Sequence, residues 1–468
     1  MISRYFFSLS AVLVLFVFIN SVFAAEQNNS VKHELSEIAN EAKSIASQYH
    51  KLGWFSGNVL LAKDGRVFHS SSFGYENLES KNHNSALTRF NLGSIMKDFT
   101  SVLVLQQVEA NNLNLDDTLS KFKLGFPEEI ASRVTVRHLL RHESGFADVF
   151  TAEYRENQLN FDSIDKKLTL LRDKPLLFEP GTDSRYSNYG YIVLGAILEK
   201  VTNIKFHELL RANVFDVLDL KHSQFFVDSS SKNQSARYTF TFDGKLREVG
   251  VTEHPSPDGG IESTTRDVQK FYRKLFYSDT LLSHSKPIIR EKFAIGGSRW
   301  TAYGGGAGVS AAVEVDLKNG FEIVVLANTD KLVAELISGR VLSFILSGKY
   351  NSIKLPETNF AYVYYQKYGR DQFVKNFKNA YQAEEYSLFI GRVINELGMQ
   401  MIESESWSEA FDMFNYLALL FPTAPQAYDS LAYAHYKKGN MQKAKEVFSK
   451  ALELNPDFIS DYKKGNYQ

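Results

Sequence analysis

The sequence contains no cysteine among its 468 residues. This absence excludes disulfide bonds, a catalytic thiol, thiolate metal ligands and lipid attachment to an N-terminal cysteine. A basic excess is also absent, because 53 lysines and arginines stand against 54 aspartates and glutamates. The charge balance therefore gives no reason to expect a nucleic acid or an anionic membrane surface as partner. The length and a hydrophobic share of 44% allow two or three domains with sizeable cores.

Several common catalytic and cofactor motifs are missing as well. The sequence has no P-loop and no G-x-G-x-x-G stretch, and His142-Glu143 lacks the further histidine of a zinc-protease helix. Residues 308–312 come nearest to the G-x-S-x-G turn of α/β-hydrolases, but they lack the last glycine. The 11 histidines form no tight ligand cluster. We therefore expect no metal and no cofactor.

The N-terminal apolar run is too short for a typical membrane span. Ala11–Ile19 is nine uninterrupted apolar residues, against about 20 for a span. Arg4 precedes this run, and Val22 and Ala24 have the spacing that signal peptidase recognises. We interpret residues 1–24 as a cleaved signal peptide, with an uncleaved membrane anchor as the alternative. The mature protein is then expected in the periplasm or secreted.

Strand and helix signals at both ends of residues 25–350 predict one α+β domain. Apolar residues at helical spacing cover Val31–Leu52, and a second helix is expected over Lys331–Leu346. Glycine-containing turns predict three β-hairpins, at Ser56–Ser71, around Asp243-Gly244 and at Ala311–Ala327. The middle of the domain is mostly helical. This order favours an antiparallel sheet assembled from both ends of the domain.

An internal repeat of 34 residues follows this domain. Five positions match in register: Leu397 with Leu431, Gly398 with Ala432, Ala410 with Ala444, Phe414 with Phe448, and Pro422 with Pro456. The pattern resembles two tetratricopeptide repeats, 391–424 and 425–458. Two repeats are fewer than usually stand alone, so we expect residues 351–390 to form a helical linker or cap, with a tail at 459–468. Such repeats bind peptides or proteins, and we expect a partner of that kind here.

An S-x-x-K spacing occurs six times, and its context selects the one at Ser94. Ser94-Ile95-Met96-Lys97 opens an apolar helical run, which would place Lys97 on the same helix face as the Ser94 hydroxyl. Free N–H groups at a helix start suit an oxyanion, and a buried lysine can lose its proton and assist the serine. The plainer alternative is an N-cap serine followed by a solvated lysine.

Three further segments favour the catalytic interpretation. They are Val134–Phe146 (VTVRHLLRHESGF), Phe178–Gly195 with Tyr186-Ser187-Asn188, and Asp258–Thr264 (DGGIEST). In this order with Ser94 and Lys97, they resemble the penicillin-binding serine hydrolases: class C β-lactamases, D-amino-acid peptidases and related carboxylesterases. The resemblance covers about residues 50–345. It implies a β-lactamase/transpeptidase-like α+β domain, with an antiparallel sheet and a helical subdomain, followed by an all-α repeat domain. His138 and His142 match a structural loop of the family, which implies packing or capping roles.

The resemblance implies a role for each matching side chain. Ser94 matches the acylated nucleophile and Lys97 its partner. Tyr186 matches the tyrosine that shares the proton transfer, and Asn188 the asparagine that positions the lysine and the substrate. A tyrosine serves as a base only if neighbouring cations lower its pKa from about 10.

The third family motif, usually K-T-G or H-x-G, departs from the pattern in this chain. We align it with Tyr303-Gly304-Gly305, so that a phenol stands where the family has a cation or an imidazole. The backbone N–H of Gly306 would then complete an oxyanion hole with that of Ser94.

The resemblance implies an exported serine hydrolase that forms an acyl-enzyme on Ser94 and acts on esters or amides. A phenol at Tyr303 offers one hydrogen bond and an aromatic face, where a cation would attract an anionic group. Uncharged short-chain esters or neutral amides are therefore expected to be better substrates than penicillins. Two alternatives stay open: a catalytically weak binding protein whose repeats recruit a partner, and a true β-lactamase or D-amino-acid peptidase.

Overall fold

The structure is a computed structural model that describes residues 31–225, 232–251, 253–293, 295–462 and 467. The interpreted signal peptide, residues 1–24, lies outside the described residues. The chain divides into two compact units: Met1–Phe240 with Leu246–Ser352, and Thr241–Lys245 with Ile353–Gln468. None of the described helices has an apolar stretch of the length needed to cross a membrane.

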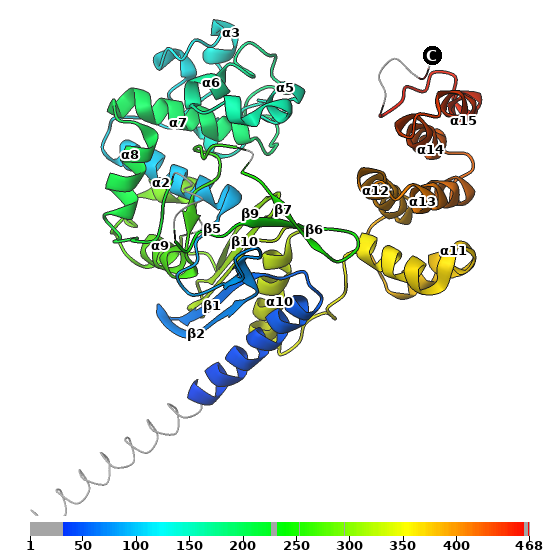
Figure 1. The fold of residues 1–468 in the computed structure, drawn as a ribbon. Coiled ribbons are helices and arrows are strands. Elements are labelled where there is room, and N and C mark those ends of the chain that lie inside the picture. Colours follow the sequence, from blue (N-terminus) through cyan, green and yellow to red (C-terminus); the bar gives the residue numbers. More distant parts are fainter. Residues whose placement is uncertain (1–30, 226–231, 252, 294, 463–466, 468) are drawn as a thin grey trace, which may run out of the picture. The chain divides into compact units, whose positions relative to one another are not determined.

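A five-stranded antiparallel sheet forms the centre of the first unit (Figure 1). In spatial order its strands are β2 (Arg66–Phe73), β1 (Gly57–Lys63), β11 (Phe321–Ala327), β10 (Val309–Asp316) and β9 (Arg299–Gly306). Strand β1 pairs with β11 along its whole length, from Gly57 opposite Ala327 to Lys63 opposite Phe321. The predicted antiparallel sheet, assembled from both ends of the domain, is confirmed.

Helices cover both faces of this sheet. Helix α10 (Val333–Ser347) packs on β10 and β11, and a helix through residues 31–51 lies beside it, with Arg340 over the Tyr49 ring. Helix α9 (Thr265–Tyr277) packs on β1 and β11, and α2 (Met96–Glu109) contacts β9 through Asp98 and Trp300. Strands β1, β10 and β11 are consequently buried along almost their entire length. Both predicted flanking helices, over Val31–Leu52 and Lys331–Leu346, are confirmed to within two residues at each described end.

The helical part of the first unit is organised around α2 and α7 (Asn188–Thr202), which pack against each other. Shorter helices surround them: α3 (Glu128–Ala131), α4 (Val136–Leu140), α5 (Ala152–Glu156), α6 (Ile164–Leu168) and α8 (Phe206–Leu210). The Ser187 hydroxyl accepts from the Gly190 N–H and so fixes where α7 begins. At the start of α4, Thr135 and His138 form a capping box, which confirms the predicted capping role of His138.

Three short strand pairs tie the loops of the first unit together. They are β3 (Tyr75–Asn77) with β4 (Asn82–His83), β5 (Phe90–Asn91) with β8 (Glu262–Ser263), and β6 (Arg237–Phe240) with β7 (Leu246–Val249). The β5–β8 pair holds the residues before Ser94 beside the segment that follows Asp258. Two motifs far apart in the sequence therefore meet.

The second unit consists of helices and the tip of the β6–β7 hairpin. Its helices are α11 (Glu357–Ala383), α12 (Ile390–Glu403), α13 (Trp407–Leu420), α14 (Pro425–Lys437) and α15 (Met441–Leu454). Helix α11 is interrupted at Gly369, whose φ of 73° and ψ of 171° are not helical. A Cβ on Gly398 would lie 2.6 Å from the Phe414 ring, so a small residue is required where α12 and α13 meet.

Candidate active site

Ser94 lies in the 3-10 turn η1 (Gly93–Ile95), between β5 and α2. Gly93 has a φ of 51°, a conformation that favours glycine. Its N–H donates to Asn91 Oδ1 at 2.8 Å, and Asn91 Nδ2 donates to the Gly260 carbonyl at 3.2 Å. These bonds hold the backbone of Ser94 at the start of α2, where the sequence predicted it.

Lys97 is almost fully buried, at 4% exposure. Its Nζ contacts Ser94 Oγ at 3.2 Å, Asn188 Oδ1 at 2.7 Å and the Asp258 carbonyl at 2.6 Å. Burial lowers the pKa of Lys97, although the charge of Asp258 acts in the opposite direction. A neutral amine here can donate to the Asn188 and Asp258 oxygens and turn its lone pair toward the Ser94 hydroxyl. This geometry suits a base.

Tyr186 approaches the same serine from the other side. Its hydroxyl donates to Ser94 Oγ at 2.7 Å, its ring lies 4.9 Å from Lys97 Nζ, and it stacks on His142 at 4.7 Å. Tyr186 is 50% exposed, and its partial burial raises its pKa to about 12, while the hydrogen bond to Ser94 and the charge of Lys292 act in the opposite direction. Tyr186 is therefore a protonated donor near neutral pH.

Asn188 is held in one orientation by a residue that the sequence analysis missed. Its Nδ2 donates to both oxygens of Asp148, at 3.2 and 3.1 Å. Because a carboxylate only accepts, this contact leaves Asn188 Oδ1 for Lys97. Asp148 lies in a loop, 40 residues from Asn188, and no spacing pattern points to it.

A second lysine, Lys292, lies close to this cluster and was also missed. Its Nζ is 5.5 Å from the centre of the Tyr191 ring, and Lys97 Nζ is 5.7 Å from the centre of the same ring. Burial, then Lys292 and then Lys97, lower the pKa of His142 to about 3. Neutral His142 accepts the Ser187 N–H at 3.2 Å through Nδ1, which agrees with the packing role predicted for it.

Strand β9 passes directly beside the turn that holds Ser94. A Cβ on Gly304 would lie 1.9 Å from the Leu92 carbonyl oxygen and 3.0 Å from the Ser94 nitrogen. No side chain fits in this space. Gly304 therefore lets the edge of the sheet and the start of α2 approach each other.

The register of the β9–β10 hairpin favours Gly305 over the predicted Gly306 as the second N–H donor. Gly306 pairs with Val309 across a two-residue turn, so its N–H is directed at β10. The N–H direction alternates along an antiparallel strand, which turns that of Gly305 toward the free edge. The Gly305 nitrogen lies 2.8 Å from where a Cβ on Gly93 would be. This register favours Gly305 for the role that the sequence alignment assigns to Gly306.

Tyr303 is not brought together with the other predicted site residues. Side chains alternate along β9, and Trp300 and Gly304 face α2 and the turn before it. Tyr303 therefore faces the side of the sheet covered by α10, where its hydroxyl donates to the buried Glu314 Oε1 at 2.6 Å. The predicted contact between Tyr303 and a substrate does not fit this orientation.

A cavity of about 110 Å³ opens at Ser94. Its lining includes Asn91, Lys167, Asn188, Arg237, Glu253, Asp258, Gly305 and Gly306. The cations at its wall have partners, because Lys167 Nζ donates to the His254 carbonyl at 3.2 Å and Arg237 lies 3.5 Å from the Glu262 carboxylate. Within the described part of the chain, no group of three or more histidines and carboxylates is placed to hold a metal ion.

Two family models match the chain. The β-lactamase model matches residues 43–342 and a tetratricopeptide-repeat model matches residues 425–458. The chain is 27% identical over 271 residues to penicillin-binding protein 4* of Bacillus subtilis, covering 53% of this chain and 58% of that protein. It is 26% identical over 223 residues to protein flp of Staphylococcus aureus, covering 46% of this chain and 44% of that protein. The chain thus spans about half the length of the curated relatives it matches.

A solved structure of EstCE1, described as a hydrolase with promiscuous acyltransferase activity, shares the fold. The TM-score is 0.56 at 21% identity, over 69% of this chain and all 100% of that one. At this level of identity the likeness concerns the fold alone.

Proposed function

Because the chain belongs to the β-lactamase family, whose model covers residues 43–342, we propose that it is a serine hydrolase that forms an acyl-enzyme on Ser94. One observation carries the proposal: Tyr186 Oη and Lys97 Nζ both contact Ser94 Oγ, at 2.7 and 3.2 Å. A serine between two proton-transfer groups is the arrangement that activates a hydroxyl as a nucleophile.

In the acylation step, neutral Lys97 takes the proton of Ser94 as Oγ attacks the carbonyl carbon of an ester or amide. The N–H groups of Ser94 and Gly305 stabilise the oxyanion that forms. The Tyr186 phenol gives its proton to the departing alcohol or amine and regains one from the Lys97 ammonium. Asn188 keeps the lysine in place. In deacylation, water attacks the acyl carbon and gives a proton to this pair. The bond between the acyl carbon and Ser94 Oγ then breaks, the carboxylic acid leaves, and the pair returns the proton to Ser94 Oγ.

Uncharged esters and neutral amides are the proposed substrates. The glycines of β9 carry no charge, and Tyr303 faces away from Ser94. Among the described residues that line the pocket, Lys167 and Arg237 each already contact an acceptor. An anionic substrate would have to compete for these cations, whereas a neutral one does not.

Substrate class is tested by steady-state kinetics with p-nitrophenyl butyrate and nitrocefin. The proposal expects the higher kcat/KM for the butyrate. A higher value for nitrocefin would refute the preference for neutral substrates while leaving the nucleophile intact.

The nucleophile itself is tested by covalent labelling. A fluorophosphonate should add its mass to the peptide that contains Ser94, and Ser94→Ala should abolish both this labelling and the turnover of p-nitrophenyl butyrate. Ser120→Ala is a matched control, because Ser120 also opens an S-x-x-K spacing but lies in another turn. Labelling that survives in Ser94→Ala would show that the assignment is wrong.

Export and partner binding belong to the same proposal. Residues 1–24 direct the protein out of the cytoplasm and are removed, and residues 391–458 bind a protein or peptide. N-terminal sequencing of the exported protein tests the first statement, with residue 25 as the expected start. A mature protein that still begins at Met1 would contradict it.

A further inference from the structure

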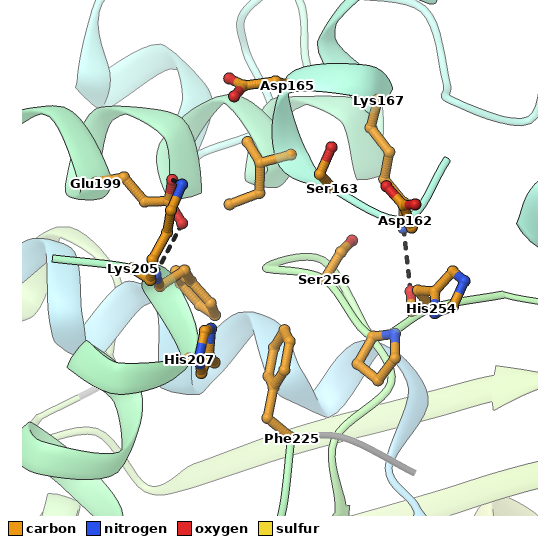
Figure 2. A pocket seen from close by; sticks show the side chains of 13 residues that line it. Asp162, Ser163, Asp165, Lys167, Glu199, Lys205, His207, Phe225, His254 and Ser256 are labelled. Atoms are coloured by element: carbon orange, nitrogen blue, oxygen red, sulfur yellow. Dashed lines mark hydrogen bonds and ion pairs between the residues drawn. The ribbon is translucent and has the colours of Figure 1, made fainter. Parts of the chain in front are cut away.

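A second cavity, of about 220 Å³, lies next to the pocket at Ser94 and is about twice as large. Lys167, His254 and Ser256 line both hollows, so these three residues form their shared boundary. Figure 2 shows their side chains around the second cavity. The proposed reaction does not use this space.

The inner wall of the second cavity is largely apolar. It is formed by Ile164, Phe206, His207, Phe225 and Pro255. The Phe225 ring lies 5.8 Å from that of Phe206 and 6.1 Å from that of His207. Aromatic and aliphatic surfaces of this kind gain free energy by covering an apolar ligand group.

Five charged side chains line this cavity: Asp162, Asp165, Lys167, Glu199 and Lys205, of which Lys167 is buried. Lys205 contacts Glu199 at 3.1 Å, as Figure 2 shows, and Asp162 contacts Lys166 at 2.9 Å. Lys205 and Asp162 are 65% and 50% exposed, so water screens them strongly. Exposed pairs of this kind attract a charged ligand only weakly.

The boundary between the two hollows is a side chain and a loop. Lys167, at 2% exposure, extends from α6, and its Nζ donates to the His254 carbonyl at 3.2 Å. Beyond this contact, Ser256 borders both spaces. A substrate group bound at Ser94 would enter the second cavity by passing this boundary.

Building on the proposed function, we infer that the second cavity is a substrate subsite for an uncharged aryl or branched alkyl group. The smaller pocket, with its polar and glycine lining, suits the reacting carbonyl, and the larger apolar cavity suits the substituent. Either the acyl part or the alcohol or amine part of the substrate carries this group.

Ile164 gives the sharpest test, because it lines the second cavity and does not line the pocket at Ser94. Ile164→Trp fills the cavity and Ile164→Ala enlarges it. The acyl arm compares p-nitrophenyl phenylacetate with p-nitrophenyl acetate, and the alcohol arm compares 2-phenylethyl acetate with ethyl acetate. The readout is the ratio of kcat/KM for the phenyl-bearing substrate to that for its small partner.

One of the two substrate pairs carries its phenyl group into the cavity. For that pair, Ile164→Trp should lower the kcat/KM ratio roughly tenfold or more, and Ile164→Ala should raise it. The pair that changes shows whether the acyl part or the alcohol part of the substrate carries the group. Val217→Trp is the control, because Val217 is half exposed and does not line the cavity; it should leave the ratio unchanged. General damage to the protein lowers both rates in both Ile164 variants and cannot move the ratio in opposite directions.

An unchanged ratio in both arms, for both Ile164 variants, overturns the inference. If Ile164→Trp does not fold, the direction of the ratio in Ile164→Ala decides. Failure of the proposed function is a separate result. It would be seen if Ser94→Ala hydrolysed the acetates as fast as the unaltered protein does.

Discussion

For single residues, burial and charge separate the roles of Lys97 and Tyr186. Both contact Ser94 Oγ. Burial lowers the pKa of Lys97, the cationic acid, but raises the pKa of Tyr186 to about 12, since in each case it disfavours the charged form. Near neutral pH the amine therefore loses its proton more easily than the phenol does. This difference makes the lysine the base and the tyrosine the donor.

Replacing Lys292 with methionine should move the ascending limb of the kcat/KM pH profile to higher pH. Lys97 must be neutral to accept a proton, and the Lys292 charge adds to burial in lowering the pKa of Lys97. Asp258, Tyr191 and Asp148 act in the opposite direction and would remain. Without Lys292 the pKa of Lys97 rises, so a larger fraction of the protein has a protonated Lys97 at a given pH. The measurement is a pH profile with p-nitrophenyl butyrate.

Two variants control for this effect. Lys292→Arg keeps the cation and should keep the limb near its original pH. Lys286→Met removes an exposed lysine that contacts the Glu109 carbonyl and should leave the profile unchanged. A Lys292→Met protein that is slower at every pH, with an unshifted limb, would mean that Lys292 acts only through packing.

Tyr303→Phe should lower thermal stability while leaving kcat/KM for p-nitrophenyl butyrate within about twofold. The phenol is the hydrogen-bond donor to Oε1 of the buried Glu314. Removing this donor takes one hydrogen bond from a buried carboxyl, at a cost of about 1–3 kcal/mol. Thermal unfolding and steady-state kinetics measure the two effects. A Tyr303→His variant that gains nitrocefin turnover would instead favour the sequence alignment that placed Tyr303 in the site.

At the scale of elements, the sequence predicted those turns and helices that depend on residues close together in the chain. The turn of the first hairpin contains Asp64 and Gly65, both with positive φ, and it joins β1 to β2 where expected. The short helices α3 to α6 carry too few residues for a visible period, so their positions were not predicted. Asp148 and Lys292 lie in connecting segments, where no spacing rule links them to Ser94.

The sequence alone could not decide between Gly305 and Gly306 as the second N–H donor. Which N–H faces the site depends on the pairing register of β9 with β10, and a shift of one residue reverses it. The sequence motif located the glycines but did not indicate how β9 pairs with β10. The same alternation separates Tyr303 from the site.

Gly304→Ala should abolish hydrolysis, whereas Gly305→Ala should retain most of it. A Cβ on Gly304 would overlap the Leu92 carbonyl at 1.9 Å, so β9 has to move away from the turn that holds Ser94. A Cβ on Gly305 meets nothing closer than Leu332 Cδ2 at 4.0 Å, and its N–H is kept. The measurement is kcat/KM for p-nitrophenyl butyrate, with circular dichroism to confirm folding. Equal activity in the two variants would contradict the proposed close approach.

For the whole molecule, the predicted resemblance to penicillin-binding serine hydrolases followed by a tetratricopeptide-type region is confirmed by the family matches. The second unit, however, includes five residues that the sequence placed in the first domain. Thr241–Lys245, the tip of the β6–β7 hairpin, belongs to it. Phe242 is buried there, with its ring 4.9 Å from that of Tyr362. The sequence of a hairpin does not indicate which hydrophobic core its tip will pack into.

Deleting residues 353–468 should preserve ester hydrolysis, provided that Phe242 is changed as well. All proposed catalytic residues precede Ser352, so the truncated chain keeps the complete site. The deletion also removes Asn359, whose amide donates to the Thr241 and Phe242 carbonyls, and exposes the Phe242 ring. Phe242→Ser should therefore raise the soluble yield of the truncated chain, and kcat/KM for p-nitrophenyl acetate should stay within a few fold of the full chain. The full chain with Phe242→Ser is the control. If the truncated Phe242→Ser chain were folded and soluble but inactive, residues 353–468 would be needed for catalysis. The full chain with Phe242→Ser differs from it only in having those residues.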